Sequence, residues 1–257
     1  MLNKEYFTEG QILLIDKPLE WSSFQAVNAL KWAIRKKFDL NKKFKIGHAG
    51  TLDPLATGLL LICTGKFTKK IPELQGQPKE YTGTFTLGAT TPSYDLETAI
   101  DHTFSVEHLT SDTICATAQN FLGKIEQFPP LFSAIKKDGK RLYEFARKGE
   151  AVEIKSRNIE IFEFEIIKIS IPEVHFRVVC SKGTYIRSLA HDFGRALGSG
   201  ANLSSLRRTK IGDFNVNKAQ TPNDFRDWLS KQTTKTDSIE CYNFGKSGLL
   251  EDHESES

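Results

Sequence analysis

The 257-residue chain is predicted to be an α+β protein built around an antiparallel or mixed central β-sheet flanked by helices and loops. Three features predict this fold class. Residues 156–181 form two long runs rich in Ile, Val and Phe that break at Ile171-Pro172, as expected for paired strands. Apolar residues recur at helical spacing over 26–34 and again over 186–197. Strands and helices do not alternate as regular βαβ units, which indicates the α+β class.

The first elements follow from apolar spacing and from the residues that interrupt it. Residues 11–15 form a short apolar strand, and Pro18 stops it because proline has no N–H for a strand ladder. Either Ser22 or Ser23 is expected to cap the helix that follows. That helix continues through about Lys37 and carries basic residues on its polar face.

The middle of the chain holds an apolar segment, an alternating strand and a helix. Residues 59–63 are apolar, and residues 81–87 alternate between threonines on one side and Gly83, Phe85 and Leu87 on the other. The side chain of Ser111 is expected to cap a helix over 112–121.

The last elements are a strand and an amphipathic helix joined by a reversal of the chain. Over 174–180, alternate apolar residues share one face of the strand. Gly183 then reverses the chain into the helix over 186–197. The helical spacing turns Arg187 away from the apolar stripe, toward solvent or a cleft.

We expect one catalytic domain over residues 1–230. Residues 130–155 are a polar, basic insertion with a helix around 141–148. Apolar periodicity is lost beyond Leu229, and the chain ends in an acidic, small-residue segment. Residues 231–257 are therefore expected to be a disordered acidic tail.

Composition fits a soluble globular protein of the cytoplasm. The chain is 39% hydrophobic, no apolar run approaches the roughly 20 residues that span a bilayer, and the first residues lack the layout of a signal peptide. Cys63, Cys115, Cys180 and Cys241 lack the spacing of a metal site or a disulfide framework. We expect four free thiols, three of them in the core, and no metal.

The charge is distributed unevenly along the sequence. Segments 31–48, 136–148 and 182–210 together carry 19 basic and 4 acidic residues, a net charge of +15, whereas the whole chain carries only +3. Long helices also display lysine and arginine to water, so any one segment is weak evidence. Three such segments together favour a surface that binds nucleic acid.

One short run concentrates the chemistry. From Lys45 to Gly58 the chain reads KIGHAGTLDPLATG, which sets a single carboxylate, Asp53, in a turn of small residues. Glycines there remove side chains that would block a ligand. Asp before Pro is also a common helix N-cap, so Asp53 taken alone could be structural.

The whole run resembles the signature of the TruB family of pseudouridine synthases, Gly-His-x-Gly-x-Leu-Asp-Pro-x-Ala-x-Gly, at every fixed position. Further motifs resemble the family in its order and at about its spacing, and the resemblance spans about residues 10–215. These motifs are Lys79-Glu80-Tyr81, Pro129-Pro130 with Ser133-Ala134, Gly139-Lys140-Arg141, and Gly183-Thr184-Tyr185-Ile186-Arg187-Ser188-Leu189.

The resemblance implies the pseudouridine synthase fold and the isomerisation of uridine to pseudouridine at position 55 in the T-loop of tRNA, without a cofactor. It implies that Asp53 acts on a flipped-out base and that Arg187 pairs with it, where a planar guanidinium could hold the carboxylate bidentately. Tyr81 would stack on the uracil and its hydroxyl could move the C5 proton. Whether Asp53 attacks C6 or C1′, or assists formation of a glycal, is left open by the sequence.

The resemblance also implies contacts with RNA around the reacting base. Tyr185 would orient Asp53 or Arg187, and His48 would take the place of the flipped base or contact neighbouring nucleotides. Three further residues, Lys17, Lys66 and Leu206, would border the cleft. The basic segments would grip phosphates, with the 130–155 insertion closing over RNA as a thumb. The residues expected to do so are Lys45, Lys136, Lys140, Arg141, Arg147, Arg207 and Arg208.

The expected partner is the T-arm stem-loop of tRNA. The chain has no room for the separate PUA domain of many relatives, so we expect a monomeric, bacterial-type enzyme that needs no guide RNA, accessory protein, metal or membrane. An RNA chaperone that opens and refolds tRNA is the alternative. Asp53→Asn separates the two, because an amide keeps a cap but cannot act as a nucleophile.

Overall fold

The computed structural model describes residues 2–133, 136–137, 140–141, 144–145, 152 and 154–233. Arg147, most of the helix expected over 141–148 and the predicted tail from residue 234 onward lie outside the described residues. So do the side chains of Lys136, Lys140 and Arg141, whose backbone forms part of a short hairpin.

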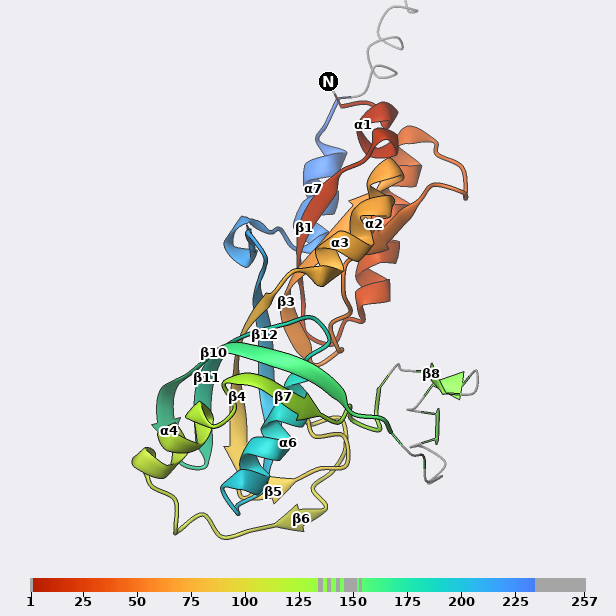
Figure 1. Cartoon of the computed structure of the whole chain (residues 1–257). Helices are drawn as coiled ribbons and strands as arrows, with labels where there is room; N and C mark the ends of the chain where they lie inside the picture. The colour runs from red at the N-terminus through yellow and green to blue at the C-terminus, as the bar shows by residue number, and fades with distance from the viewer. Residues whose placement is uncertain are drawn as a thin grey trace, which may run out of the picture.

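Strands dominate the chain order (Figure 1). The strands are β1 (Ile12–Lys17), β2 (Ile46–His48), β3 (Ala56–Thr64), β4 (Lys79–Leu87), β5 (Ala89–Thr90), β6 (His102–Thr103), β7 (Gly123–Gln127), β8 (Lys136–Lys137), β9 (Lys140–Arg141), β10 (Arg157–Ser170), β11 (Glu173–Cys180), β12 (Ala201–Ile211) and β13 (Phe214–Asn215). The helices are α1 (Lys4–Glu9), α2 (Ser23–Phe38), α3 (Ile71–Gly76), α4 (Ser111–Gln119), α6 (Ile186–Ala196) and α7 (Pro222–Ser230), with 3₁₀ turns η1 (Gly65–Lys70) and η2 (Val216–Lys218).

The central sheet is mixed, which confirms the predicted fold class. Its strand order is β1-β3-β12-β4-β11-β10-β7, with β2 added to β3 and β13 added to β12. Strands β3 and β12 run parallel, and the other neighbouring pairs in this sheet are antiparallel. Strand β12 therefore lies between β3 and β4, although it is made much later in the chain.

Strand β3 is buried on both faces, as a run of consecutive apolar residues requires. Leu60 and Ile62 pack in one core cluster with residues of α2 and α7. Leu59 and Leu61 face a second cluster on the other side of the sheet. The apolar 59–63 segment thus joins two cores and forms a rigid base for the residues just before it.

Helices α2 and α7 lie together at one end of the molecule, and α4 and α6 lie at the other (Figure 1). Ser22 is the N-cap of α2, in a capping box with Gln25, so the choice left open between Ser22 and Ser23 falls on Ser22. Ser23 is instead buried, and its hydroxyl bonds the backbone of Leu52.

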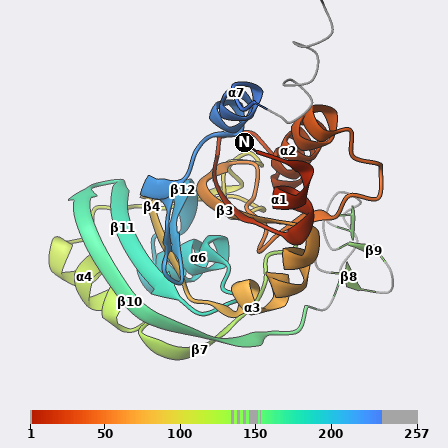
Figure 2. The ribbon, with the colours of Figure 1, turned by 90° about the horizontal axis from the view of Figure 1, so that it is seen from above.

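The largest core lies between the sheet and helices α4 and α6. Seen from above, the strands from β12 to β7 curve around α6 (Figure 2). Val174, Phe176 and Val178 of β11 face this core as predicted, and Phe85 stacks on Phe176 with ring centroids 4.1 Å apart. The core fixes where α6, and with it Arg187, stands against the sheet.

The start and the end expected for the helix over 112–121 were wrong. Thr110, not Ser111, caps α4, and the helix ends at Gln119. Cys115 is exposed, because the neighbouring Ile114 takes the buried face of α4, whereas Cys63 and Cys180 are buried. Cys241 lies outside the described residues.

No helix in the described ranges is long and apolar enough to cross a membrane.

Candidate active site

Asp53 lies in a tight connection between β2 and β3, residues 49–55, which we call the signature loop. The Ala56 N–H donates to the Asp53 carbonyl, and strand β3 begins at once. No helix follows Pro54, so the reading of Asp53 as a helix N-cap is wrong. Its carboxylate is 42% exposed and turns toward α6 instead.

Buried side chains from α2 and β1 hold the signature loop in place. The Ser23 hydroxyl accepts from the Leu52 N–H at 2.8 Å and donates to the Leu52 carbonyl at 3.1 Å. The Lys17 ammonium donates to the carbonyls of Pro18, Trp21 and Pro54, at 2.9, 2.5 and 3.3 Å. Because side-chain hydrogen bonds reach both sides of Asp53, the position of its carboxylate is defined by the fold.

The expectation that Lys17 borders the cleft was wrong. Lys17 lies fully buried under the loop. Burial lowers the pKa of its ammonium to about 8, because a charged amine loses hydration there. Asp53 is near enough to oppose part of that shift.

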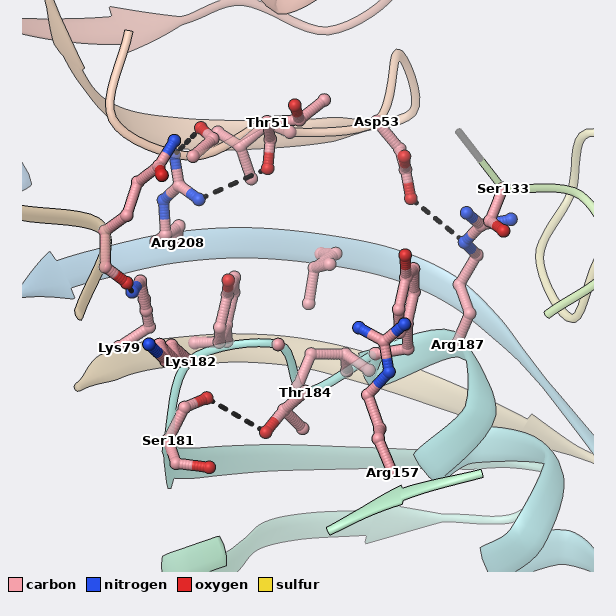
Figure 3. Close-up of a pocket in the computed structure, with 18 of the residues that line it drawn as sticks. Thr51, Asp53, Lys79, Ser133, Arg157, Ser181, Lys182, Thr184, Arg187 and Arg208 are labelled. Carbon is pink, nitrogen blue, oxygen red and sulfur yellow. Dashed lines mark hydrogen bonds and ion pairs between the residues drawn. The ribbon is translucent and has the colours of Figure 1, made fainter. Parts of the chain in front are cut away.

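Arg187 meets Asp53 across the loop, as predicted (Figure 3). Its Nε lies 2.9 Å from Asp53 Oδ2, and the guanidinium is only 5% exposed. The Nε hydrogen is not aligned with any acceptor among the described residues. The contact with Asp53 is therefore an ion pair by distance and not a hydrogen bond. The guanidinium makes no hydrogen bond to Asp53, so the expected bidentate grip is absent. Nη1 donates instead to the carbonyls of Ser93 and Phe132, at 3.2 and 3.0 Å.

A second carboxylate, which the sequence did not single out, completes the group. Asp95 Oδ2 lies 3.5 Å from Arg187 Nε, and its side chain is 7% exposed. The other oxygen of Asp95 accepts from the Ser93 hydroxyl and from the Glu97 N–H. Asp95 is thus a fixed buried anion that holds Arg187, whereas Asp53 is the more accessible of the two. An acid in a polar loop after a strand is too common a pattern to find it from the sequence.

The pair opens into a cleft of about 890 Å³ between the sheet and the start of α6. Tyr81, Tyr185 and Leu206 line it together with Asp53 and Arg187, as the sequence suggested. Five further cations line the same cleft, namely Lys79, Lys155, Arg157, Lys182 and Arg208. A cleft with this excess of positive charge suits a polyanion.

The two tyrosines are held differently. Tyr81 is 8% exposed, and burial raises the pKa of its phenol, while the nearby Arg208 guanidinium opposes part of that rise. Tyr185 is the N-cap residue of α6, and Gln127 bonds both its N–H and its carbonyl, at 2.8 and 3.0 Å. The Arg157 guanidinium lies 5.5 Å from the Tyr185 ring centroid. Both rings are therefore fixed before any ligand enters.

Three residues expected to contact RNA do not line the Asp53 cleft. Lys66 is not beside the Asp53 cleft, because η1 follows the far end of the nine-residue strand β3, about 30 Å away along the strand. It pairs with Glu9 at 2.5 Å and lines, with the exposed Lys45, a second hollow of about 440 Å³. His48, on β2, is half-buried and does not line the Asp53 cleft, and burial lowers its pKa.

The consecutive arginines of β12 also depart from expectation. Arg207 is paired with both carboxylate oxygens of Asp16, at 3.0 and 2.6 Å, so its charge is already matched. Arg208 is 1% exposed and donates to backbone carbonyls, so it is not placed to grip phosphates from outside. In the part of the chain that the structure describes, no cluster of His, Cys, Asp or Glu could hold a metal ion.

Whole-chain comparisons support this picture. A protein of Flavobacterium johnsoniae named tRNA pseudouridine synthase B is 69% identical over 85% of this chain and 95% of its own length. A protein of Phocaeicola vulgatus with the same name is 53% identical, over 88% of this chain and 96% of its own.

Solved structures resemble the chain as well. A chain from a crystal structure of a Cbf5-Nop10-Gar1 complex matches with a TM-score of 0.65 and 31% identity, over 88% of this chain. One from the structure of an H/ACA RNP bound to a substrate RNA containing 2′-deoxyuridine matches with a TM-score of 0.64 and 27% identity, over 90% of this chain. The present chain spans only 56% and 58% of those two chains.

The mixed sheet and the Asp53–Arg187 pair in a basic cleft, taken with these matches, define a pseudouridylate synthase. Residues 35–186 match the family described as TruB family pseudouridylate synthase, N-terminal domain, and residues 187–244 match the tRNA pseudouridylate synthase B C-terminal domain. The chain belongs to the TruB family.

Proposed function

We propose that this protein isomerises uridine to pseudouridine at position 55 in the T-loop of tRNA, without a cofactor. The observation that carries the proposal is the accessible Asp53 carboxylate held against a buried Arg187 in a basic cleft. Relatives named tRNA pseudouridine synthase B support the choice of substrate.

The reaction needs no outside reactant. The bond from ribose C1′ to N1 of uracil breaks, the base turns, and C1′ bonds to C5. C5 loses its hydrogen and N1 gains one, so atoms and electrons balance within the nucleotide. Asp53 is the group that engages the flipped nucleotide. The Arg187 guanidinium lies against its carboxylate, and Asp95 holds Arg187 from the other side.

The remaining cleft residues bind the substrate. A base inside an RNA stack is out of reach, so the uridine must be flipped into the cleft. Tyr81 supplies a ring face for the extruded uracil, and Tyr185 and Leu206 complete the walls. Lys182 and Arg157 meet the flanking phosphates, which gives affinity that falls with salt. Lys79 is only 7% exposed and donates to the carbonyls of Gln75 and Gln77, so it adds positive charge to the cleft without touching a phosphate.

Other parts of the proposal rest on the family resemblance. Residues 1–230 act as one catalytic domain, the 130–155 insertion closes over bound RNA, and residues 231–257 are a tail outside the chemistry. His48 and Lys45 contact RNA beyond the target base. The enzyme works as a monomer in the cytoplasm, where bacterial tRNA is matured, without guide RNA or accessory protein.

The test is to incubate the purified protein with an unmodified T-arm stem-loop in the absence of any cofactor, and to map pseudouridine. We expect conversion at the T-loop uridine by the wild type and none by Asp53→Asn. Asp39→Asn is the matched control, because Asp39 lies in the left-handed region at the end of α2, where asparagine is well tolerated. Full activity of Asp53→Asn, or RNA refolding without conversion by the wild type, would refute the proposal.

A further inference from the structure

Arg208 has an unusual environment for an arginine. It lies on β12 with 1% of its surface exposed, and it directs its guanidinium at backbone carbonyls of the chain segment that carries Asp53. Nε donates to the Leu59 carbonyl at 2.7 Å, Nη2 to the Gly50 carbonyl at 3.1 Å, and Nη1 to the Thr51 carbonyl at 3.4 Å. One side chain thus bonds the chain both before and after Asp53. Figure 3 shows the contact on the side of Thr51.

The charge on this arginine is costly. Across the described ranges, the guanidinium donates to carbonyls, and no ion pair joins it to a carboxylate. Burying a charge without a counter-charge opposes folding, and an apolar side chain of similar volume often serves stability equally well. The guanidinium therefore indicates a task other than stability.

The glycines of the signature fit around this arginine. A Cβ on Gly58 would lie 2.3 Å from the Arg208 carbonyl oxygen, so only glycine lets β3 and β12 approach there. Gly50 has a φ of +104°, and a Cβ there would lie 3.7 Å from Arg208 Nη1. The turn that the sequence presents as open to a ligand is thus also shaped to receive Arg208 from within.

The same residue stands beside the tyrosine of the cleft. In the antiparallel pairing of β12 with β4, Arg208 is the direct partner of Tyr81, and in the parallel pairing with β3 it is the partner of Gly58. Arg208 therefore joins the strand that carries Tyr81 to the loop that carries Asp53, and both residues line the cleft with it.

We propose that Arg208 is a positioning residue that holds the signature loop through its carbonyls and so fixes the Asp53 carboxylate relative to the Tyr81 ring. The inference rests on the proposed function and assigns Arg208 a role inside the protein rather than on RNA phosphates. An error of about 1 Å in the position of a reacting group can cost roughly 100-fold in rate.

The test uses Arg208→Met, which keeps the volume but loses the donors, and Arg208→Lys, which keeps the charge. Arg208 reaches its three carbonyls through three separate nitrogens, and the single nitrogen of a lysine does not reproduce that spacing. We expect single-turnover conversion of the T-arm stem-loop to slow about 100-fold in Arg208→Met and at least about 10-fold in Arg208→Lys. Affinity for the pseudouridine-containing product stem-loop should change less than about threefold, since no phosphate contact is lost.

Hydrogen exchange separates positioning from general destabilisation. Amides of residues 49–53 should exchange faster in both variants, while those of β10 and β11 stay as in the wild type. Thr209→Val is the matched control, because Thr209 on the same strand bonds Glu80 and not the loop. It should leave both the rate and loop exchange near wild type.

Three results would overturn the inference: a wild-type rate in Arg208→Lys and Arg208→Met, a loss confined to RNA affinity, or faster exchange spread evenly over the sheet. If Arg208→Met fails to fold, Arg208→Lys decides by the same criteria. Loop exchange is measured without RNA, so it still reports on Arg208 if the protein proves inactive on the T-arm.

Discussion

Replacing Arg187 with lysine tests the central pair, because it keeps the charge and removes the geometry. Arg187 serves Asp53 through Nε and two backbone carbonyls through Nη1, at the same time. A lysine offers one nitrogen, which cannot occupy both places. Either Asp53 loses its cation, or the carbonyls of Ser93 and Phe132 are left without a donor.

The free energy lost with the Asp53–Arg187 pair can be estimated from the distance between the two charges. Unit charges at the observed 2.9 Å attract by about 1.4 kcal/mol at the dielectric constant of water and about 6 kcal/mol at an effective value near 20. Because Asp53 is 42% exposed, solvent screening places the pair toward the lower end, at about 2–3 kcal/mol. We therefore expect Arg187→Lys to react roughly 30- to 140-fold more slowly, at about 1.4 kcal/mol per tenfold.

The assay is the release of tritium from C5 of a labelled T-arm uridine under single-turnover conditions, beside a melting curve that reports folding. Arg195→Lys is the matched control on the same helix, because that side chain is 78% exposed. A folded Arg187→Lys that reacts within about threefold of wild type would show that Asp53 does not depend on this arginine.

Two further outcomes are expected. Ser23→Ala leaves the buried Leu52 N–H without an acceptor, which should lower the free energy of unfolding by about 1–3 kcal/mol in urea titrations. Ser204→Ala, which removes a hydroxyl bonded to the Thr84 carbonyl, should cost less. Equal losses in the two variants would show that Ser23 does not hold the loop more firmly than an ordinary serine. Burial lowers the pKa of Lys79 in the cleft to about 8, so its charge is present below that pH and is lost above it. Affinity for the product stem-loop should weaken about two- to fivefold between pH 7 and 9, because the loss of one screened charge near the RNA is worth roughly 0.5–1 kcal/mol. A similar fall in Lys79→Met would assign the titration to another group.

Elements fixed by local pattern could be predicted from the sequence, and their pairing could not. The apolar spacing of α2 and the alternation of β11 are local, and both elements form where expected. The insertion of β12 between β3 and β4 depends on contacts between segments far apart in the chain. The α4 cap was misplaced by one residue because Thr110 and Ser111 are equally good caps from sequence.

The site divides in the same way. Asp53 and Arg187 lie in motifs and meet as predicted. Asp95 reaches Arg187 only because its loop folds against α6, which the sequence around it does not show. Arg207 and Arg208 look equivalent in the sequence and were given the same role. The alternation of side chains along a strand carried the missing signal, because it sends one toward Asp16 and the other into the interior.

The placement of β12 has a consequence for how the protein comes into being. A nascent chain that has emerged only as far as residue 200 already contains the Asp53 loop, Tyr81 and Arg187, yet the middle of its sheet is missing. Strands β3 and β4 do not pair with each other. They are joined only when residues 201–211 leave the ribosome and pair with both of them. Synthesis interrupted before that point therefore releases a polypeptide with every chemical group of the cleft and no means of assembling them.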